Sequence, residues 1–236
     1  MSVPTANGNK YILTFIDDYS RMCWVYLFKE KSQVFDMFKK FPLFITNEAQ
    51  LNISTIRIDN GGEYTSHVFE KYLQLNGIKH QTTIPYNPQQ NSVAERLNIT
   101  LLNMVWSMMF FKNAKFMIWG EEVLCAAYIR NWCPSSIMNN KIPYEMWYNH
   151  LPDVKHFTIF GSQCYALIPK HQRNKLSERS KKCIFLGYSM NSKVYILYDE
   201  ENKKFILSRD VIFLEYDKDT LIFDMQLNQL EKFLPA

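Results

Sequence analysis

Two carboxylates at a defined spacing are the residues of this sequence best suited to catalysis. Asp59 follows an alternating apolar segment, residues 53–58, and Glu95 lies near the start of a long helical pattern, with the 35 residues 60–94 between them. Phosphoryl transfer assisted by two metal ions needs several carboxylates that converge on hard cations such as Mg²⁺. An aspartate at the end of a strand and a glutamate on a helix can supply two of the carboxylate ligands of such a site.

Each acid also has an ordinary structural interpretation. Asp59 can be the turn-forming residue of Asp-Asn-Gly, and Glu95 can be a charge on a helix surface. For either residue taken alone, this interpretation is the better one. Only the surrounding motifs, described below, favour a shared catalytic role.

The first half of the chain predicts a mixed α/β unit. Residues 11–16 and 23–28 are two apolar runs rich in β-branched and aromatic residues, which is typical of a hairpin. Apolar residues spaced by three and four, or alternating, predict the elements that follow. We expect helices over residues 31–47, 68–76, 92–111 and 118–131, and strands over residues 53–58 and 78–84.

The second half predicts a small all-β unit. After Pro152 the chain consists of short β-rich runs, and Asp199-Glu200-Glu201-Asn202 is typical of a hairpin turn. We therefore expect a core domain over residues 1–150, a β-barrel domain over 151–216 and a tail over 217–236. The predicted strands cover residues 157–168, 182–188, 194–198 and 205–214.

The composition of the chain argues against a disulfide-rich, secreted or membrane-spanning protein. With 236 residues, of which 47% are hydrophobic, the chain can bury a core, and its net charge of +4 permits a polyanionic partner without requiring one. The five cysteines are odd in number and widely spaced, so neither a disulfide framework nor a zinc pair is indicated. No signal peptide and no membrane-spanning run is visible, which indicates an intracellular protein.

Several motifs in order resemble those of copia-type retrotransposon integrases. Ile-Arg-Ile-Asp-Asn-Gly-Gly-Glu-Tyr-Thr-Ser (56–66) and Pro-Tyr-Asn-Pro-Gln-Gln-Asn-Ser-Val-Ala-Glu-Arg (85–96) are similar to the two central motifs of that family. In the family these motifs carry the second and third acids of a D,D-35-E triad. The similarity continues through residues 16–21, 118–122, 142–147 and 181–188.

The resemblance implies a ribonuclease H-like core followed by a small β-barrel domain. It also implies joining of element DNA ends to target DNA with Mg²⁺ or Mn²⁺, action in the nucleus, and DNA and further integrase copies as partners. By the same resemblance, Asp59 and Glu95 match the metal ligands. Asn60, Gln89 and Gln90 match motif positions close to the site and are candidates for positioning DNA.

The sequence departs from the family pattern at the first acid. In the family that aspartate belongs to a central strand whose position lies upstream of Met1, so Asp17 and Asp18 are not assigned to it and are expected to cap a turn. Without that strand the sheet has a slot of unpaired backbone groups, each costing roughly 1–3 kcal/mol when buried. Either the natural product is longer or something else fills the slot, and the chain by itself is expected to be inactive.

A second departure concerns the helix that bears Glu95. Positions 99, 102 and 106 lie within about 40° of it around the helix, and there the sequence has Ile99, Leu102 and Trp106 where the family has basic or polar residues. Packing against a neighbouring segment or another subunit is the preferred interpretation, ahead of stacking on DNA. These changes indicate a decayed or repurposed copy.

The best candidate for phosphate contacts is the basic run of residues 170–182, although such runs are more often solvated loops. Besides an integrase, the sequence leaves two other functions open: a non-catalytic nucleic-acid-binding module and a protein-interaction scaffold. The basic residues singled out in the run are Arg173, Lys175, Arg179 and Lys181.

Overall fold

The computed structural model describes residues 3–58, 61, 66–82, 92–112, 118–174, 178–189 and 192–214. The chain divides into two compact units, Met1–Phe157 and Thr158–Ala236, and each is described here by itself. The domain ranges 1–150 and 151–216 stay predictions, and the expected tail, 217–236, lies outside the described residues.

The first unit begins with the expected hairpin. Strands β1 (Tyr11–Ile16) and β2 (Cys23–Phe28) pair antiparallel, with Tyr11 opposite Phe28 and Ile16 opposite Cys23. Their side chains alternate between two faces of the ribbon, so each face meets a different helix. The predicted hairpin is confirmed.

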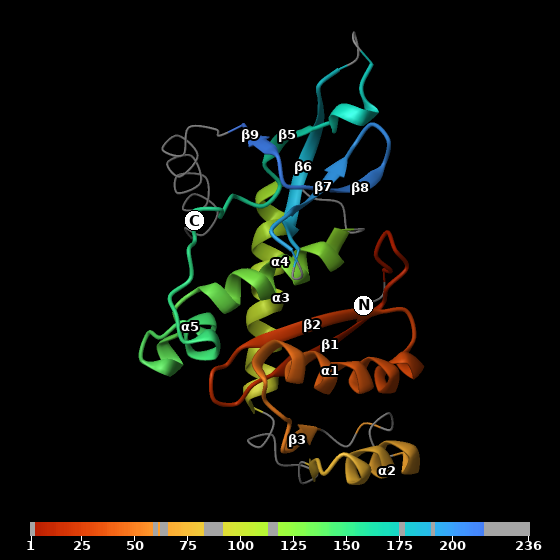
Figure 1. Ribbon diagram of the computed structural model, residues 1–236, viewed down its shortest axis with the longest axis vertical. Coiled ribbons are helices and arrows are strands. Elements are labelled where there is room, and N and C mark those ends of the chain that lie inside the picture. Colours follow the sequence, from red (N-terminus) through yellow and green to blue (C-terminus); the bar gives the residue numbers. More distant parts are fainter. Residues whose placement is uncertain are drawn as a thin grey trace, which may run out of the picture. The chain divides into compact units, whose positions relative to one another are not determined.

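Helix α1 (Val34–Ala49), preceded by a 3-10 turn over Lys31–Gln33, covers one face of the hairpin (Figure 1). Its four buried residues, Val34, Phe38, Phe41 and Ile45, recur at intervals of three and four and so form one stripe. The Phe41 ring stacks on Phe15 of β1 with a centroid distance of 3.9 Å and an interplanar angle of 6°.

A β-α-β segment follows. Strands β3 (Thr55–Ile58) and β4 (Lys79–Thr82) pair in parallel, and α2 (His67–Leu75) connects them. Ser66 caps α2 by accepting a hydrogen bond from the Phe69 backbone N–H at 3.3 Å. Gly77, with φ of 65°, ends it in the left-handed conformation that favours glycine.

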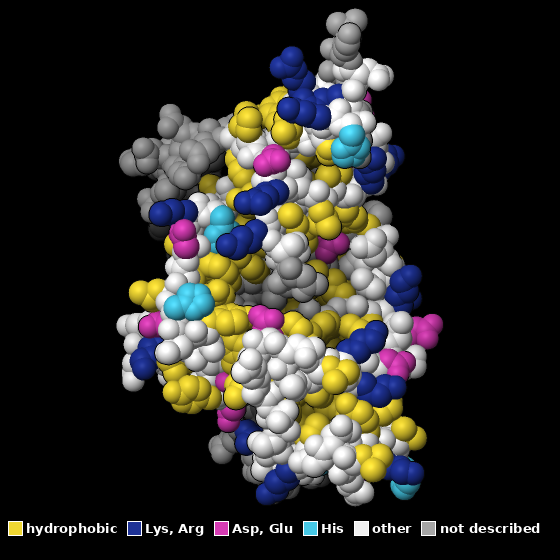
Figure 2. All heavy atoms as spheres, viewed as in Figure 1, with side chains coloured by type: hydrophobic (Ala, Val, Ile, Leu, Met, Phe, Trp, Pro, Cys, Tyr) yellow, Lys and Arg dark blue, Asp and Glu magenta, His cyan; other side chains and the backbone are white. Residues whose placement is uncertain are grey.

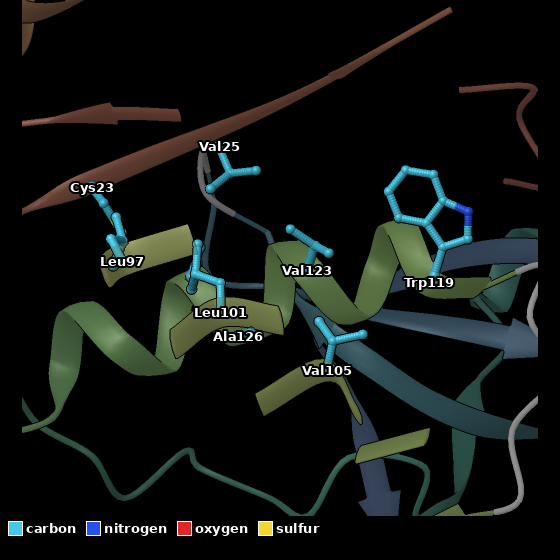
Figure 3. Close-up of a cluster of buried hydrophobic side chains, with 9 residues drawn as sticks. Cys23, Val25, Leu97, Leu101, Val105, Trp119, Val123 and Ala126 are labelled. Atoms are coloured by element: carbon cyan, nitrogen blue, oxygen red, sulfur yellow. The ribbon is translucent and has the colours of Figure 1, made fainter. Parts of the chain in front are cut away.

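Helices α3 (Ser92–Lys112) and α4 (Trp119–Trp132) lie on the other face of the hairpin. Figure 3 shows their shared core, in which Leu97, Leu101 and Val105 of α3 meet Val123 and Ala126 of α4 beneath Cys23 and Val25 of β2. Two short elements were not anticipated from the sequence: a 3-10 turn over Ser136–Met138 and α5 (Pro143–Tyr148).

Among the described residues, the first unit contains two separate two-stranded sheets, β1-β2 and β3-β4. The second unit is a five-stranded antiparallel sheet in the order β8-β7-β6-β5-β9. Its strands are β5 (Gln163–Leu167), β6 (Ser180–Tyr188), β7 (Tyr195–Asp199), β8 (Lys204–Ser208) and β9 (Val211–Phe213).

Two strand predictions after Pro152 are wrong in their bounds. Residues 157–162, predicted as the start of the first strand, lie outside it, because β5 begins at Gln163. Residues 205–214 do not form a single strand, because the chain bends at Arg209-Asp210 and separates β8 from β9. Strand β8 pairs with β7, whereas β9 crosses to the opposite edge and pairs with β5. The expected turn after β7 is confirmed, since the Asp199 carboxylate accepts hydrogen bonds from the Asn202 backbone N–H at 3.0 Å and its side-chain amide at 2.8 Å.

Candidate functional site

The end of β3 and the start of α3 are the elements that position the two acids expected to bind metal. Ile58 is the last residue of β3, so Asp59 follows it directly, but Asp59, Asn60, Gln89 and Gln90 lie outside the described residues. Of these catalytic and DNA-positioning candidates, only Glu95 can be placed.

Glu95 lies in the first turn of α3, where the unpaired backbone N–H groups of a helix favour negative charge. Its side chain is exposed and makes no ion pair or hydrogen bond among the described residues. Within the described part of the chain, nothing occupies this carboxylate.

The chain segments that lead into both acids meet at one cavity of about 410 Å³. Ile58, immediately before Asp59, and Ala94, immediately before Glu95, both line it. The separation between the two carboxyl groups stays a prediction. No group of three or more possible metal ligands occurs within the described ranges.

Asp17 and Asp18 line the same cavity but are engaged elsewhere. The Asp17 carboxylate accepts hydrogen bonds from the backbone N–H and the hydroxyl of Ser20, both at 2.7 Å, and Asp18 pairs with Arg21 at 2.6 Å. These contacts stabilise the turn between β1 and β2. The interpretation of Asp17 as a turn-capping residue is confirmed.

The apolar side chains on the Glu95 face of α3, which were expected to pack against a neighbouring segment or another subunit, are exposed. Ile99, Leu102 and Trp106 are 58%, 37% and 57% exposed, and Phe110 extends the same stripe at 81%. No described segment of this chain therefore covers these residues. Contact with another subunit stays a hypothesis.

The basic run offers fewer free charges than the sequence indicated. Arg179 is exposed and Arg173 is half-buried, whereas Lys175 lies outside the described residues. Lys181 lies within β6, and its amino group is 3.8 Å from the buried carboxylate of Asp199. Figure 2 shows lysine and arginine side chains scattered over the visible face of the molecule, including the five-stranded sheet.

Two buried polar residues of α4 were not recognised as important from the sequence. Asn131 is hydrogen-bonded to both backbone groups of Cys23, and Glu122 is fully buried with no partner for either carboxylate oxygen among the described residues. Desolvation raises the pKa of Glu122 to about 7. The available signals for Glu122 were its place in the helical pattern of residues 118–131 and in the family-like motif of residues 118–122.

Each unit contains a segment that matches the model of a known protein family. Residues 1–88 match the family model described as the integrase core domain, and residues 162–222 match the retroviral polymerase SH3-like domain. No helix among the described residues is long and apolar enough to cross a membrane.

Two plant polyproteins are similar over most of the chain. The retrovirus-related Pol polyprotein from transposon TNT 1-94 of Nicotiana tabacum is 43% identical over 93% of this chain, which is 17% of that polyprotein. The Pol polyprotein from transposon RE2 of Arabidopsis thaliana is 31% identical over 87% of this chain and 14% of its own length. The chain thus spans less than a fifth of these relatives.

A solved structure, the simian T-cell lymphotropic virus intasome in complex with PP2A regulatory subunit B56 gamma, contains a chain that is 18% identical. The similarity covers 88% of this chain and 73% of that chain, with a TM-score of 0.49.

Proposed function

Because this chain belongs to the copia-type retrotransposon Pol polyproteins, as an integrase core followed by a retroviral SH3-like domain, we propose that it binds DNA and holds a divalent cation between Asp59 and Glu95. The observation that carries the proposal is the shared cavity, since the residues preceding both acids line it and the exposed Glu95 carboxylate has no ion pair or hydrogen bond among the described residues.

The donor set fits Mg²⁺ or Mn²⁺, because hard cations prefer carboxylate oxygens. A bound cation supplies Lewis-acid stabilisation of the charge that develops on phosphate oxygens during strand transfer. Asp59 and Glu95 hold it, while the side-chain amides of Asn60, Gln89 and Gln90 position DNA beside it. Since Asp17 and Asp18 are engaged in their turn, the described residues offer no third free carboxylate at this cavity, and we expect the 236-residue chain to be a poor strand transferase.

If Asp59 and Glu95 hold the cation, replacing either acid should lower the affinity of the chain for Mn²⁺. Asp59→Asn and Glu95→Gln are each expected to weaken Mn²⁺ binding by at least about tenfold, because each removes a charged ligand worth about 1.4 kcal/mol or more. Isothermal titration calorimetry with Mn²⁺ measures the change. Asp18→Asn is the matched control, since Asp18 lines the same cavity but pairs with Arg21. Equal losses in all three variants would show general charge attraction instead of a site.

DNA binding is expected to be electrostatic and carried mainly by the second unit. Replacing Arg173, Lys175, Arg179 and Lys181 by alanine should lower the slope of log affinity against log salt by up to about 3.6 on duplex DNA, at about 0.9 for each phosphate that is no longer neutralised. Fluorescence anisotropy with a labelled duplex, titrated at several salt concentrations, gives this slope.

The control for that experiment removes the same number of charges from exposed positions of the second unit. It replaces Lys193, Lys203, Lys204 and Arg209 by alanine. The same slope for both four-residue variants, or binding that does not respond to salt, would contradict a phosphate-binding role for the 170–182 run.

A protein-interaction role is the second candidate. It is favoured by the exposed side chains of Ile99, Trp106 and Phe110 on the helix that bears Glu95. Large exposed apolar side chains on one helix face are typical of interaction surfaces. A chain that binds neither Mn²⁺ nor duplex DNA in the two experiments above would favour this role.

A further inference from the structure

Helix α3 is apolar on two opposite sides. One side, with Leu97, Leu101 and Val105, is buried in the core that α3 shares with α4 and β2 (Figure 3). The other side carries a second row of large apolar side chains, which are exposed and are called the outer stripe: Ile99, Leu102, Trp106 and Phe110. The core of the first unit accounts for the first row but leaves the outer stripe uncovered.

The outer stripe is continuous along the helix. Its members recur at intervals of three and four, so they lie within about 80° of one another and extend over about 16 Å, or three turns. Contiguous apolar surface of this kind on a soluble chain marks a contact with a partner.

The hydroxyl groups beside the outer stripe do not need water. The Thr100 hydroxyl donates to the Arg96 carbonyl at 2.8 Å, and the Ser107 hydroxyl donates to the Asn103 carbonyl at 2.9 Å. Both groups can therefore be covered without losing a hydrogen bond. The side chain of Asn103, which is exposed, is the polar interruption of the stripe.

The charge of this part of α3 selects among possible partners. Residues 97–111 contain no acidic, basic or histidine side chain. Nucleic acids and anionic lipid surfaces attract proteins largely through lysine and arginine, which the outer stripe does not offer. The same stretch of a second chain is equally uncharged, so two copies meet without repulsion.

The exposed area is sufficient for a weak dimer. A fully exposed aromatic side chain offers about 150–250 Å², so Trp106 and Phe110 together expose roughly 300 Å² at their observed exposed fractions. With Ile99 and Leu102 included, two copies can bury roughly 900 Å² of side-chain surface, close to the about 1,000 Å² at which specific interfaces begin. We therefore expect a dissociation constant in the micromolar range.

The order of side chains favours an antiparallel pair. When the two ends of the outer stripe are matched, Phe110 of one chain lies opposite Ile99 of the other, and Trp106 lies beside Leu102. Each large ring then meets a smaller side chain. Antiparallel helices also bring opposite ends of their dipoles together, and a twofold axis closes the contact after two copies.

We propose that two copies of this chain pair through the outer stripe of α3, antiparallel about a twofold axis midway between Ile99 and Phe110. The inference rests on the protein-interaction role described above and is independent of DNA and Mn²⁺ binding. Glu95 precedes Ile99 by one turn and lies outside the paired stretch.

Sedimentation equilibrium of the whole chain between about 1 and 100 µM measures the dissociation constant of the dimer. Trp106→Asp should raise this constant at least tenfold, because it removes the largest ring and buries a carboxylate. Leu43→Asp and Leu75→Asp place the same charge at exposed apolar positions of α1 and α2 and should leave it unchanged. Circular dichroism checks that all three variants fold.

A substitution in the opposite direction separates pairing from misfolding. Asn103→Leu completes the outer stripe and should lower the dissociation constant about fivefold. A tighter discrete dimer is not what misfolding produces. At submicromolar concentration, where both proteins are monomeric, the substitution should leave stability nearly unchanged.

Disulfide trapping tests the orientation. The background variant is Cys133→Ser, because Cys133 is the one cysteine of the chain that is not buried. Chains with Ile99→Cys and chains with Phe110→Cys are mixed and oxidised with copper phenanthroline. Antiparallel pairing predicts a disulfide between the two different chains, whereas parallel pairing predicts disulfides between identical chains.

Three results would overturn the proposal: a monomer at about 100 µM, equal weakening by Trp106→Asp and by the two leucine controls, or disulfides between identical chains in place of mixed ones. A monomer that binds duplex DNA and Mn²⁺ would overturn this inference alone. A dimer that binds neither would overturn only the DNA and metal proposal. A monomer that binds anionic vesicles through Trp106 would assign the outer stripe to a lipid surface.

Discussion

Replacing Asn131 by leucine is expected to lower the free energy of unfolding of the first unit by about 2–6 kcal/mol, from two buried backbone groups at about 1–3 kcal/mol each. The Asn131 side chain accepts a hydrogen bond from the Cys23 N–H at 2.9 Å and donates one to the Cys23 carbonyl at 2.7 Å. Cys23 belongs to the edge of β2 that faces away from β1, and both residues are almost completely buried.

Leucine has a similar size but can neither donate nor accept, so both backbone groups of Cys23 lose their partner while the volume is nearly conserved. Urea unfolding followed by tryptophan fluorescence measures the loss. Asn103→Leu, at an exposed position of α3, is the matched control and should change stability by no more than about 0.5 kcal/mol. A loss for Asn131→Leu as small as that of the control would mean that water reaches Cys23.

Replacing Glu122 by glutamine is expected to make the stability of the first unit less dependent on pH. Glu122 is fully buried, and desolvation raises its pKa from the ordinary 4.5 to about 7. Between these two values the folded chain binds the proton more tightly than the unfolded chain does. Stability therefore falls as pH rises from 4.5 through 7 and stays reduced above that range.

The neutral amide of glutamine avoids the cost of a buried charge. At pH 8 Glu122→Gln should stabilise the chain by about 3 kcal/mol at most, because a shift of one pKa unit corresponds to about 1.4 kcal/mol. At pH 4 the two proteins should be nearly equally stable. The neighbouring thiol of Cys125, whose pKa burial raises to about 12, stays neutral throughout and does not add to the change.

Urea unfolding at pH 4, 6 and 8 gives the free energy of unfolding of each protein as a function of pH. Glu30→Gln, which removes one carboxylate from an exposed position of the same unit, is the control for the loss of a negative charge. Parallel curves for the wild-type chain and Glu122→Gln would show that the Glu122 carboxylate is solvated in the folded state.

Local patterns in the sequence were sufficient to predict most of the elements. Two apolar runs rich in β-branched and aromatic residues predicted the β1-β2 hairpin, and apolar residues at intervals of three and four predicted α1 and α3 to within a few residues. These patterns reflect interactions within a few positions along the chain. The six-residue helix α5 and the bend between β8 and β9 were missed, because such short segments contain too few periods to identify.

The sequence by itself determined the family of the chain and the succession of an α/β unit and a β unit. Its assignment of Asp59 and Glu95 as metal ligands stays a prediction. Only the tertiary structure decided which polar groups are buried and which strands pair. Asn131 meets Cys23 across 108 positions of the chain, and the cavity is formed by strands more than 35 residues apart. Burial and edge pairing arise from contacts between distant segments, which no local pattern of residue types records.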